Sequence, residues 1–164
     1  MDKTFEPDVI IAGAGIAGAT LALALRQGGL EPVLIDPAPF DSQLAPTFDG
    51  RASAIAYAAF RQWRALGVGE ALAPHAQPIE QILVTDGRTP GAATPAPLPF
   101  HLRFDSAEIA DRSEGEPLGY LLENRQIRAA LARAVEAAGI PVLAPARVAS
   151  AVFGKGGTEI TLDD

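Results

Sequence analysis

The sequence contains no cysteine in its 164 residues. Disulfides and thiolate metal ligands are therefore excluded, and cysteine usage gives no indication of the cellular compartment. Aromatic residues make up only 6% of a chain that is 48% hydrophobic, so its core must consist mainly of Ala, Val, Leu and Ile. Long apolar runs are also absent, since none approaches the ~20 residues that a membrane-spanning helix needs. The polar N-terminus is unlike a signal peptide, and we expect a soluble, cytoplasmic protein of one-domain size.

Positive charge and histidine are scarce as well. The net charge is −7, which argues against nucleic acid as a partner. His75 and His101 are the only histidines, and neither has a second histidine or a carboxylate cluster at metal-ligand spacing. We therefore predict no metal site, and we interpret both histidines as surface or packing residues rather than catalytic bases.

Residues 8–36 are the most informative part of the sequence. They read DVIIAGAGIAGATLALALRQGGLEPVLID, and Gly13, Gly15 and Gly18 give the G-x-G-x-x-G spacing. In a dinucleotide-binding turn the first glycine permits a sharp turn, the second lets the backbone approach a pyrophosphate, and the third lets helix and strand pack closely. A helix that begins near Ile16 would direct its unpaired N–H groups and the positive end of its dipole at the phosphates.

The flanking residues agree with this interpretation. Residues 9–11 form an apolar run typical of a strand buried on both faces, and residues 19–25 are helix formers that end at residues 28–29, both glycine. Residues 33–35 predict a second buried strand. Asp36 follows it, about 20 residues after the turn, where a carboxylate can bind the hydroxyls of an adenosine ribose. The alternative is a βαβ unit that binds nothing and ends in a solvated acid.

Residues 37–50 are rich in Pro, Asp and Gly and predict a loop. After this loop, Ser53 is a candidate N-cap for a helix that continues to about Leu66 and stops at Gly67. Helical spacing places on one side of this helix Ala56, Tyr57, Phe60 and Trp63. We interpret this aromatic stripe as core packing.

Arg51 stands on the loop that leaves the dinucleotide unit, just before the predicted helix. A guanidinium there can form bidentate contacts with a pyrophosphate or approach the edge of an isoalloxazine. An exposed arginine that happens to precede a helix is an equally good interpretation of the residue alone.

The middle of the chain interrupts the α/β pattern. Residues 78–86 and 98–105 predict two paired strands, joined by the irregular connection GRTPGAATPAP. Because helices do not separate them, we expect this pair to belong to a different sheet.

The α/β pattern returns at residues 119–122, a short strand that precedes Asn124 as a candidate N-cap. A helix follows over residues 125–138, predicted to bury Ile127, Ala130, Leu131, Ala134 and Val135. Residues 140–143 predict a strand, and residues 147–162 predict a β-hairpin around a Gly-Lys-Gly-Gly turn. The parallel sheet is therefore expected to contain three strands, at 8–12, 32–36 and 140–143.

Together these segments resemble the aromatic-ring flavoprotein monooxygenases, and among them the hydroxylases of ubiquinone biosynthesis. The matching segments are DVIIAGAGIAGATLALALRQGG, VLID, DGRASAI with the helix after it, and GYLLENRQIRAALARAVEAAG. The longer flavoprotein form of the fingerprint also fits, because Ala22 is a small residue four after the third glycine and Gly29 precedes the second strand.

The resemblance implies FAD as the resident cofactor and assigns residues to it. The pyrophosphate would lie against Gly13, Gly15, Ile16, Ala17 and Gly18. The resemblance further places Asp36 at the adenosine ribose (where the family more often has Glu), Arg51 near the flavin and pyrophosphate, Asn124 and its neighbour Arg125 at the opening of the helix beside the cofactor, and the Val148 backbone near the adenine.

The resemblance also implies a reaction. NADH or NADPH would reduce the flavin, and one oxygen atom of O₂ would pass to an electron-rich phenolic ring, such as that of a quinone precursor. Such a substrate implies work beside a membrane or within a biosynthetic complex. No residue of the chain matches a catalytic base of the family, so no catalytic residue is assigned.

The expected architecture is a Rossmann-like α/β core with a β-hairpin and the beginning of a substrate-domain sheet. Residues 1–70 and 106–164 would form the FAD-binding domain and residues 71–105 the first substrate-domain strands. The family's later Asp-Gly and Gly-Asp flavin motifs do not occur, so we expect an N-terminal portion that is inactive without the remainder of the same polypeptide. The alternatives are a non-catalytic nucleotide-binding module or remnant, and another FAD or NAD(P) oxidoreductase.

Overall fold

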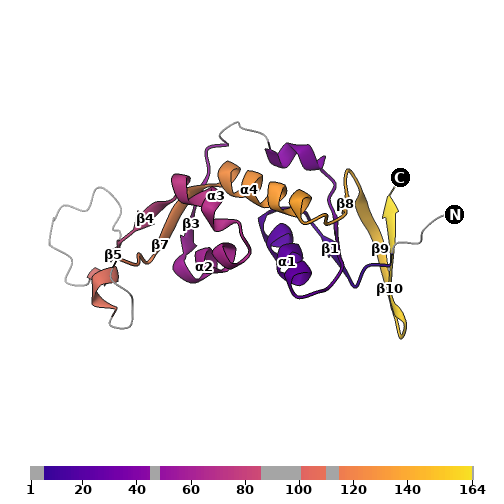
Figure 1. Cartoon of the computed structure of the whole chain (residues 1–164), viewed down its shortest axis with the longest axis horizontal. Helices are drawn as coiled ribbons and strands as arrows, with labels where there is room; N and C mark the ends of the chain where they lie inside the picture. Colours follow the sequence, from indigo (N-terminus) through magenta and orange to yellow (C-terminus); the bar gives the residue numbers. More distant parts are fainter. Residues whose placement is uncertain (1–5, 45–48, 86–100, 110–114, 164) are drawn as a thin grey trace, which may run out of the picture.

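A three-stranded parallel sheet organises one half of the structure (Figure 1). The computed structural model describes residues 6–44, 49–85, 101–109 and 115–163. The parallel strands lie in the order β1 (Val9–Ala12), β2 (Pro32–Ile35) and β8 (Val142–Leu143), which confirms the three predicted strands. Every residue of β2 is buried. The expectation that the first strand is buried on both faces is wrong, because β1 is an edge strand of this sheet and its first two residues are only half-buried.

Helix α1 (Ile16–Gln27) connects β1 to β2 and lies close to the turn before it. Gly13 adopts a φ of +109°, a backbone conformation that only glycine reaches readily. A Cβ added at Gly18 would lie 1.8 Å from the carbonyl oxygen of Gly13, so only glycine permits this approach of helix to turn. The helix ends at the predicted Gly-Gly pair.

A second, antiparallel sheet has the strand order β3 (Ala52–Ala56), β7 (Gly119–Glu123) and β4 (Gln77–Ile79). One prediction is wrong here. Ser53 does not cap a helix but lies within β3, since pairing of β3 with β7 overrides the helical preference of its alanines. The predicted strand at residues 119–122 is confirmed as β7, and it pairs with β3 and β4.

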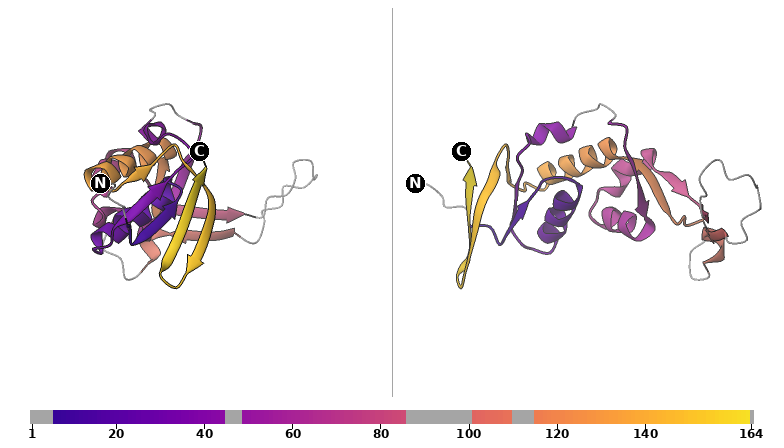
Figure 2. Two further views of the ribbon diagram at one scale, coloured as in Figure 1. Left: turned by 90° about the vertical axis from the view of Figure 1, so that its right-hand side faces the viewer. Right: turned by 180° about the vertical axis from the view of Figure 1, so that it is seen from behind.

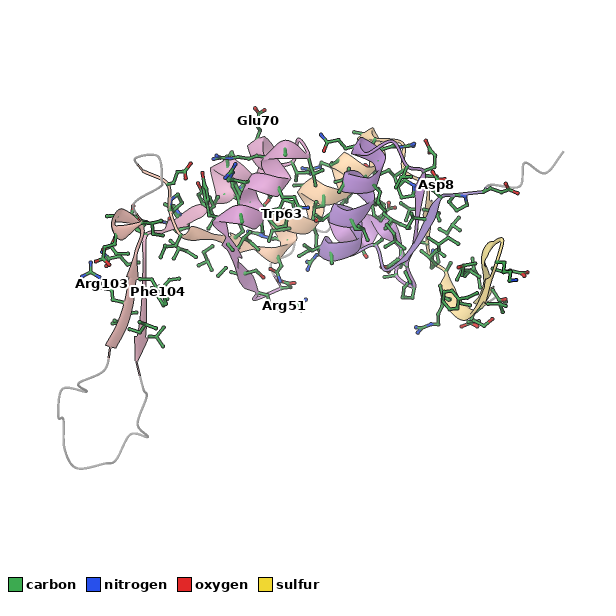
Figure 3. The ribbon with its side chains drawn as sticks, turned by 90° about the horizontal axis from the view of Figure 1, so that it is seen from below. Asp8, Arg51, Trp63, Glu70, Arg103 and Phe104 are labelled. Carbon is green, nitrogen blue, oxygen red and sulfur yellow. The ribbon has the colours of Figure 1, made fainter. Side chains whose placement is uncertain are left out.

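The aromatic stripe lies on α2 (Tyr57–Ala65), which begins only where β3 ends. Its Tyr57, Phe60 and Trp63 side chains are buried, as predicted for core packing, whereas Ala56 is an exposed strand residue. The indole Nε1 of Trp63 donates to the hydroxyl of Thr20 on α1 at 3.0 Å. This bond ties the α2 region to the dinucleotide unit (Figure 3).

Helix α4 (Asn124–Ala137) runs along the middle of the molecule and joins its two halves (Figure 1). It packs against α1, the short α3 (Gly69–Leu72) and the 3₁₀ turn η1 (Phe40–Leu44). The buried side of α4 consists of Ile127, Ala130, Leu131, Ala132 and Val135. Four of these agree with the prediction, while the predicted Ala134 is only partly buried against the core.

Two antiparallel pairs lie at opposite ends of the long axis (Figure 2). One pairs β5 (Gln81–Thr85) with β6 (His101–Asp105), which confirms that the central strands form a separate sheet. The predicted strand over 78–86 divides at Glu80 between this pair and β4, and its end, with the connection and residues 98–100, lies outside the described residues. The other is the predicted hairpin, β9 (Arg147–Gly154) with β10 (Gly157–Asp163).

Short 3₁₀ turns complete the described structure. They are η2 (Ala73–His75), which follows α3, and η3 (Ser106–Glu108), which follows β6. The predicted loop over residues 37–50 contains η1, and its residues 45–48 lie outside the described residues. Within the described ranges, no helix has the length and apolar character needed to cross a membrane.

We predict that Gly18→Ala lowers the free energy of unfolding by about 2–3 kcal/mol, although alanine is the better helix former. The reason is the overlap of the new Cβ with the Gly13 carbonyl. Urea unfolding measures the change. Gly15→Ala is the matched control, because a Cβ at Gly15 meets nothing within 4 Å. Equal stability of the two variants would contradict the close contact between helix and turn.

Candidate cofactor site

The glycine-rich turn leaves the N-terminus of α1 open. Gly15 is the N-cap residue, and no side chain caps the helix or places an acid in its first turn. The N–H groups of Ile16, Ala17 and Gly18 belong to this first turn, where a helix leaves its donors without intrahelical partners. A Cβ built on Gly15 meets open space. The turn therefore combines unused donors with room for a pyrophosphate to approach the backbone.

Asp36 follows β2 directly and is fixed against this turn. Its Oδ2 accepts a hydrogen bond from the backbone N–H of Ala14 at 2.7 Å, and its Oδ1 accepts from that of Ala38 at 2.8 Å. The residue is half-buried. Each carboxylate oxygen keeps a second acceptor position. The carboxylate can thus accept two further hydroxyl donors while the backbone holds it in place.

The base of the β9–β10 hairpin lies beside the same acid. The backbone N–H of Ala146 donates to the carbonyl of Asp36 at 2.8 Å. Val148, two residues further on in β9, is half-buried and opposite Leu162 in β10. The structure therefore brings together the glycine-rich turn, Asp36 and the segment that contains Val148.

Arg51 lies directly before strand β3 rather than just before a helix, which corrects its predicted position. Asp49 holds it at three points. The Oδ1 of Asp49 accepts from the backbone N–H of Arg51 at 3.2 Å, and its Oδ2 accepts from Nε at 3.3 Å and Nη2 at 3.0 Å. The Arg51 side chain remains 69% exposed. Figure 3 shows it at the edge of the molecule, outside the ribbon.

Asp49 also binds a second arginine. Arg128 of α4 donates from Nη1 to the same Oδ2 at 2.9 Å. This hydrogen bond, followed by those from Arg51, holds the pKa of Asp49 at about 2, below its ordinary value of 3.8. The carboxylate is therefore ionised at any pH near neutrality. The sequence reading did not single out Asp49 or Arg128, although an acid two residues before Arg51 was a visible signal.

Asn124 was predicted to be the N-cap of α4, and this is wrong. It is the first residue of the helix, and the N-cap position belongs to Glu123. The Oδ1 of Asn124 accepts from the hydroxyl of Ser53 at 2.6 Å, and its backbone N–H donates to the carbonyl of Arg51 at 3.0 Å. Arg125 donates from Nε to Glu123 at 2.5 Å. Pairing of β3 with β7 causes this arrangement, because it places Ser53 beside the start of the helix.

The predicted site residues thus form two groups. The first contains the glycine-rich turn, Asp36 and Val148, and the second contains Arg51, Asn124 and Arg125. No hydrogen bond between the groups is present in the described part of the chain. Their connection is the packing of α4 on α1.

The two histidines lie outside both groups. His75 is exposed in η2, at the surface as predicted. His101 begins β6, and the interpretation of its side chain stays a prediction. Among the residues that the structure describes, no group of three or more His, Cys, Asp or Glu residues could hold a metal ion.

Comparison with known proteins decides the family. The FAD binding domain family matches residues 6–157, which is nearly the whole chain. The chain belongs to this family. FAD is accordingly its cofactor, and the open N-terminus of α1 and the space at Gly15 fit a dinucleotide.

Two curated proteins resemble the chain over most of its length. The chain is 37% identical over 158 residues to ubiquinone hydroxylase UbiL of Rhodospirillum rubrum. This match covers 96% of the chain and 34% of that protein. It is 33% identical over 134 residues to 3-demethoxyubiquinol 3-hydroxylase of Escherichia coli, covering 79% of the chain and 30% of that protein. The chain therefore spans about a third of the length of these relatives.

A solved structure shares the fold. The flavin-dependent monooxygenase PieE, in complex with FAD and substrate, matches with a TM-score of 0.67 at 20% identity. The match covers 97% of the chain and 27% of PieE. At this identity the likeness shows the fold alone.

We predict that the contribution of Asp49 to stability is lost in acid. Because its folded-state pKa of about 2 lies below 3.8, the carboxylate stabilises the folded state above about pH 4, and this contribution disappears as the pH falls through 2. Urea unfolding of the wild type and Asp49→Asn across this range should show a difference in free energy of unfolding that narrows in acid.

The same titration in an Arg128→Met background is the control. There, the difference in free energy of unfolding between Arg128→Met and the double variant Arg128→Met/Asp49→Asn should narrow less in acid. The reason is that the hydrogen bond from Arg128 is the main cause of the lowered pKa of Asp49. A difference between wild type and Asp49→Asn that stays constant at every pH would contradict the assignment.

Proposed function

We propose that this chain is the FAD-binding part of a hydroxylase that uses NADH or NADPH and O₂ to hydroxylate the aromatic ring of a ubiquinone precursor. The observation that carries the proposal is the 37% identity to a ubiquinone hydroxylase over 96% of the chain. The geometry supports it, because the open turn at Gly15 and the fixed carboxylate of Asp36 lie together, as a bound adenine dinucleotide requires.

Each group of residues then has a role in holding FAD. The N–H groups of the α1 first turn bind the pyrophosphate, with Gly13 and Gly15 keeping side chains out of the way. The oxygens of Asp36 accept the ribose hydroxyls, and the backbone at Val148 lies near the adenine. Hydrogen bonds from Ala14 and Ala38 to Asp36 orient its carboxylate before the ribose arrives.

The second group approaches the other end of the cofactor. The guanidinium of Arg51 binds the pyrophosphate or the flavin edge. Asn124 and Arg125 open α4 beside it, and the hydrogen bond from Ser53 fixes the amide of Asn124. When bound, FAD supplies the oxygen chemistry, while the chain supplies orientation and charge.

The β5–β6 pair supports the assignment of residues 71–105 to the start of a substrate domain. One face of this pair carries the half-exposed side chains of Ile82, Val84, Leu102 and Phe104. The other face carries the hydrogen-bonded Gln81, Arg103 and Asp105, together with the exposed Leu83 opposite Arg103. Figure 3 shows Arg103 and Phe104 on opposite sides of β6. An apolar face of this kind suits a sheet that covers an apolar substrate.

Gly15→Val tests the cofactor site. The new side chain fills the space for the pyrophosphate, so FAD affinity should fall by at least about a hundredfold. Quenching of flavin fluorescence measures the affinity, with the protein expressed from its complete gene. The fold should persist, because Gly15 has no neighbour within 4 Å and an extended conformation that valine adopts.

Gly154→Val is the matched control for that measurement. Gly154 ends strand β9, and an added Cβ there makes only an ordinary contact at 3.5 Å. Its FAD affinity should equal that of the wild type. Unchanged affinity in Gly15→Val would show that the turn does not bind the pyrophosphate.

Turnover tests the reaction. The protein as its gene encodes it, supplied with FAD, NADH or NADPH and a phenol that carries a short isoprenoid tail, should consume O₂ and release a hydroxylated ring. With isotopically labelled O₂, one labelled oxygen should enter the product. NAD(P)H oxidation that yields only hydrogen peroxide with every electron-rich phenol would contradict the proposal. A hydroxylated product whose new oxygen is unlabelled, and therefore comes from water, would contradict it as well.

A further inference from the structure

Asp49, which has no part in the proposed FAD contacts, is the centre of a small charged cluster with Arg51 and Arg128. One of its oxygens, Oδ2, accepts from Arg51 Nε, Arg51 Nη2 and Arg128 Nη1, while Oδ1 accepts from the Arg51 backbone. The side chain of Asp49 is 23% exposed. Three donors of its own chain therefore occupy Oδ2, and Oδ1 is occupied at one of its two acceptor positions.

The cluster fixes Arg51 from three directions. Its backbone N–H is held by Asp49 and its backbone carbonyl by the N–H of Asn124, while the guanidinium is held along one edge. Gly50 makes this turn possible with a φ of +76°. Within the described residues no acceptor engages Nη1 of Arg51, and the side chain is mostly exposed. A held guanidinium with a free edge is ready to bind an anion.

Arg128 connects this arrangement to the framework. It lies one turn into α4, with its side chain only 21% exposed, and α4 is the helix that packs on α1. The 3₁₀ turn η1 also packs on α4. The hydrogen bond from Arg128 to Asp49 thus sets the position of Asp49 relative to the helix.

Asp49 could affect FAD affinity through its charge or by positioning Arg51, and the two mechanisms predict opposite effects of removing its carboxylate. The cluster has two cations and one anion, so removal of the carboxylate would make the site more positive and attract the phosphates of FAD more strongly. Loss of positioning would instead weaken FAD binding, because an Arg51 side chain that Asp49 does not hold loses more entropy when it binds. Water and salt screen the charge at the exposed guanidinium, so we expect the entropy effect to be larger than the charge effect.

We infer that Asp49 is a positioning residue: it holds the Arg51 guanidinium in place for the anionic part of FAD, and Arg128 anchors it to α4. The inference rests on the proposed function, since it assumes that Arg51 contacts the cofactor. Neither Asp49 nor Arg128 touches FAD in this arrangement.

A double-mutant cycle on the protein as its gene encodes it tests the inference. Asp49→Asn, which keeps the shape and removes the charge, should weaken FAD binding about tenfold, measured by flavin fluorescence at moderate and at high salt. In an Arg51→Gln background the same substitution should change the affinity little, because the residue through which it acts is gone. Arg128→Met should weaken binding in the same direction, without adding to Asp49→Asn.

A spectroscopic measurement separates positioning from general destabilisation. At saturating FAD, the visible circular dichroism of the bound flavin should change alike in Asp49→Asn and Arg51→Gln. Arg133→Met is the matched control, since it removes an exposed arginine from the same helix, and it should leave both affinity and spectrum unchanged. If Asp49→Asn does not fold, Asp49→Glu, which shifts the carboxylate by one methylene, should show the same dependence on Arg51.

Three outcomes would overturn the inference. Tighter FAD binding by Asp49→Asn, most marked at low salt, would show that the carboxylate acts by charge alone. Equal weakening with and without Arg51 would show a general structural effect. Unchanged FAD affinity would show that the cluster plays no part. Absence of FAD binding by the wild type would instead overturn the proposed function itself, so the two failures can be told apart.

Discussion

The close contact between α1 and the turn before it is the constraint on which the rest of the structure depends. The backbone of Gly18 lies so near the Gly13 carbonyl that no side chain fits between them. This contact fixes where the helix begins, and with it the direction of the free N–H groups. It also places Ala14 where its N–H meets the carboxylate of Asp36. This one contact thus positions both the open N-terminus of α1 and the acid that follows β2.

Helix α4 extends this order to the second group of site residues. Its buried side packs on α1 and η1. Its first residue, Asn124, accepts a hydrogen bond from Ser53 of β3 and donates one to the carbonyl of Arg51. The helix therefore relates Arg51 to the glycine-rich turn although no direct bond joins them in the described residues. A long, two-part cofactor such as FAD suits such an arrangement, since its ends require separate contacts held at a fixed separation.

Much of the fold follows from local pattern. The parallel strands, α1, the buried side of α4 and the C-terminal hairpin were predictable, because glycine positions and apolar spacing mark each of them. The prediction failed at residues 52–56, where three alanines and a serine at a candidate N-cap position favour a helix but pairing with β7 imposes a strand. The prediction failed for the same reason at Asn124, whose amide oxygen accepts a hydrogen bond from Ser53 and does not cap the helix. Long-range pairing has no local signature.

The sequence by itself predicted the dinucleotide unit, because the G-x-G-x-x-G spacing stands between two apolar runs and an acid follows the second. FAD as the cofactor came from the resemblance of the longer sequence pattern to a flavoprotein family. Only the tertiary structure decided what surrounds Arg51. The residues that hold it, Asp49 and Arg128, are 79 positions apart, and their hydrogen bond exists only because α4 packs beside the loop. The structure likewise decided that β3 is a strand. Contacts between distant segments depend on how the core closes, and residue spacing carries no information about that closure.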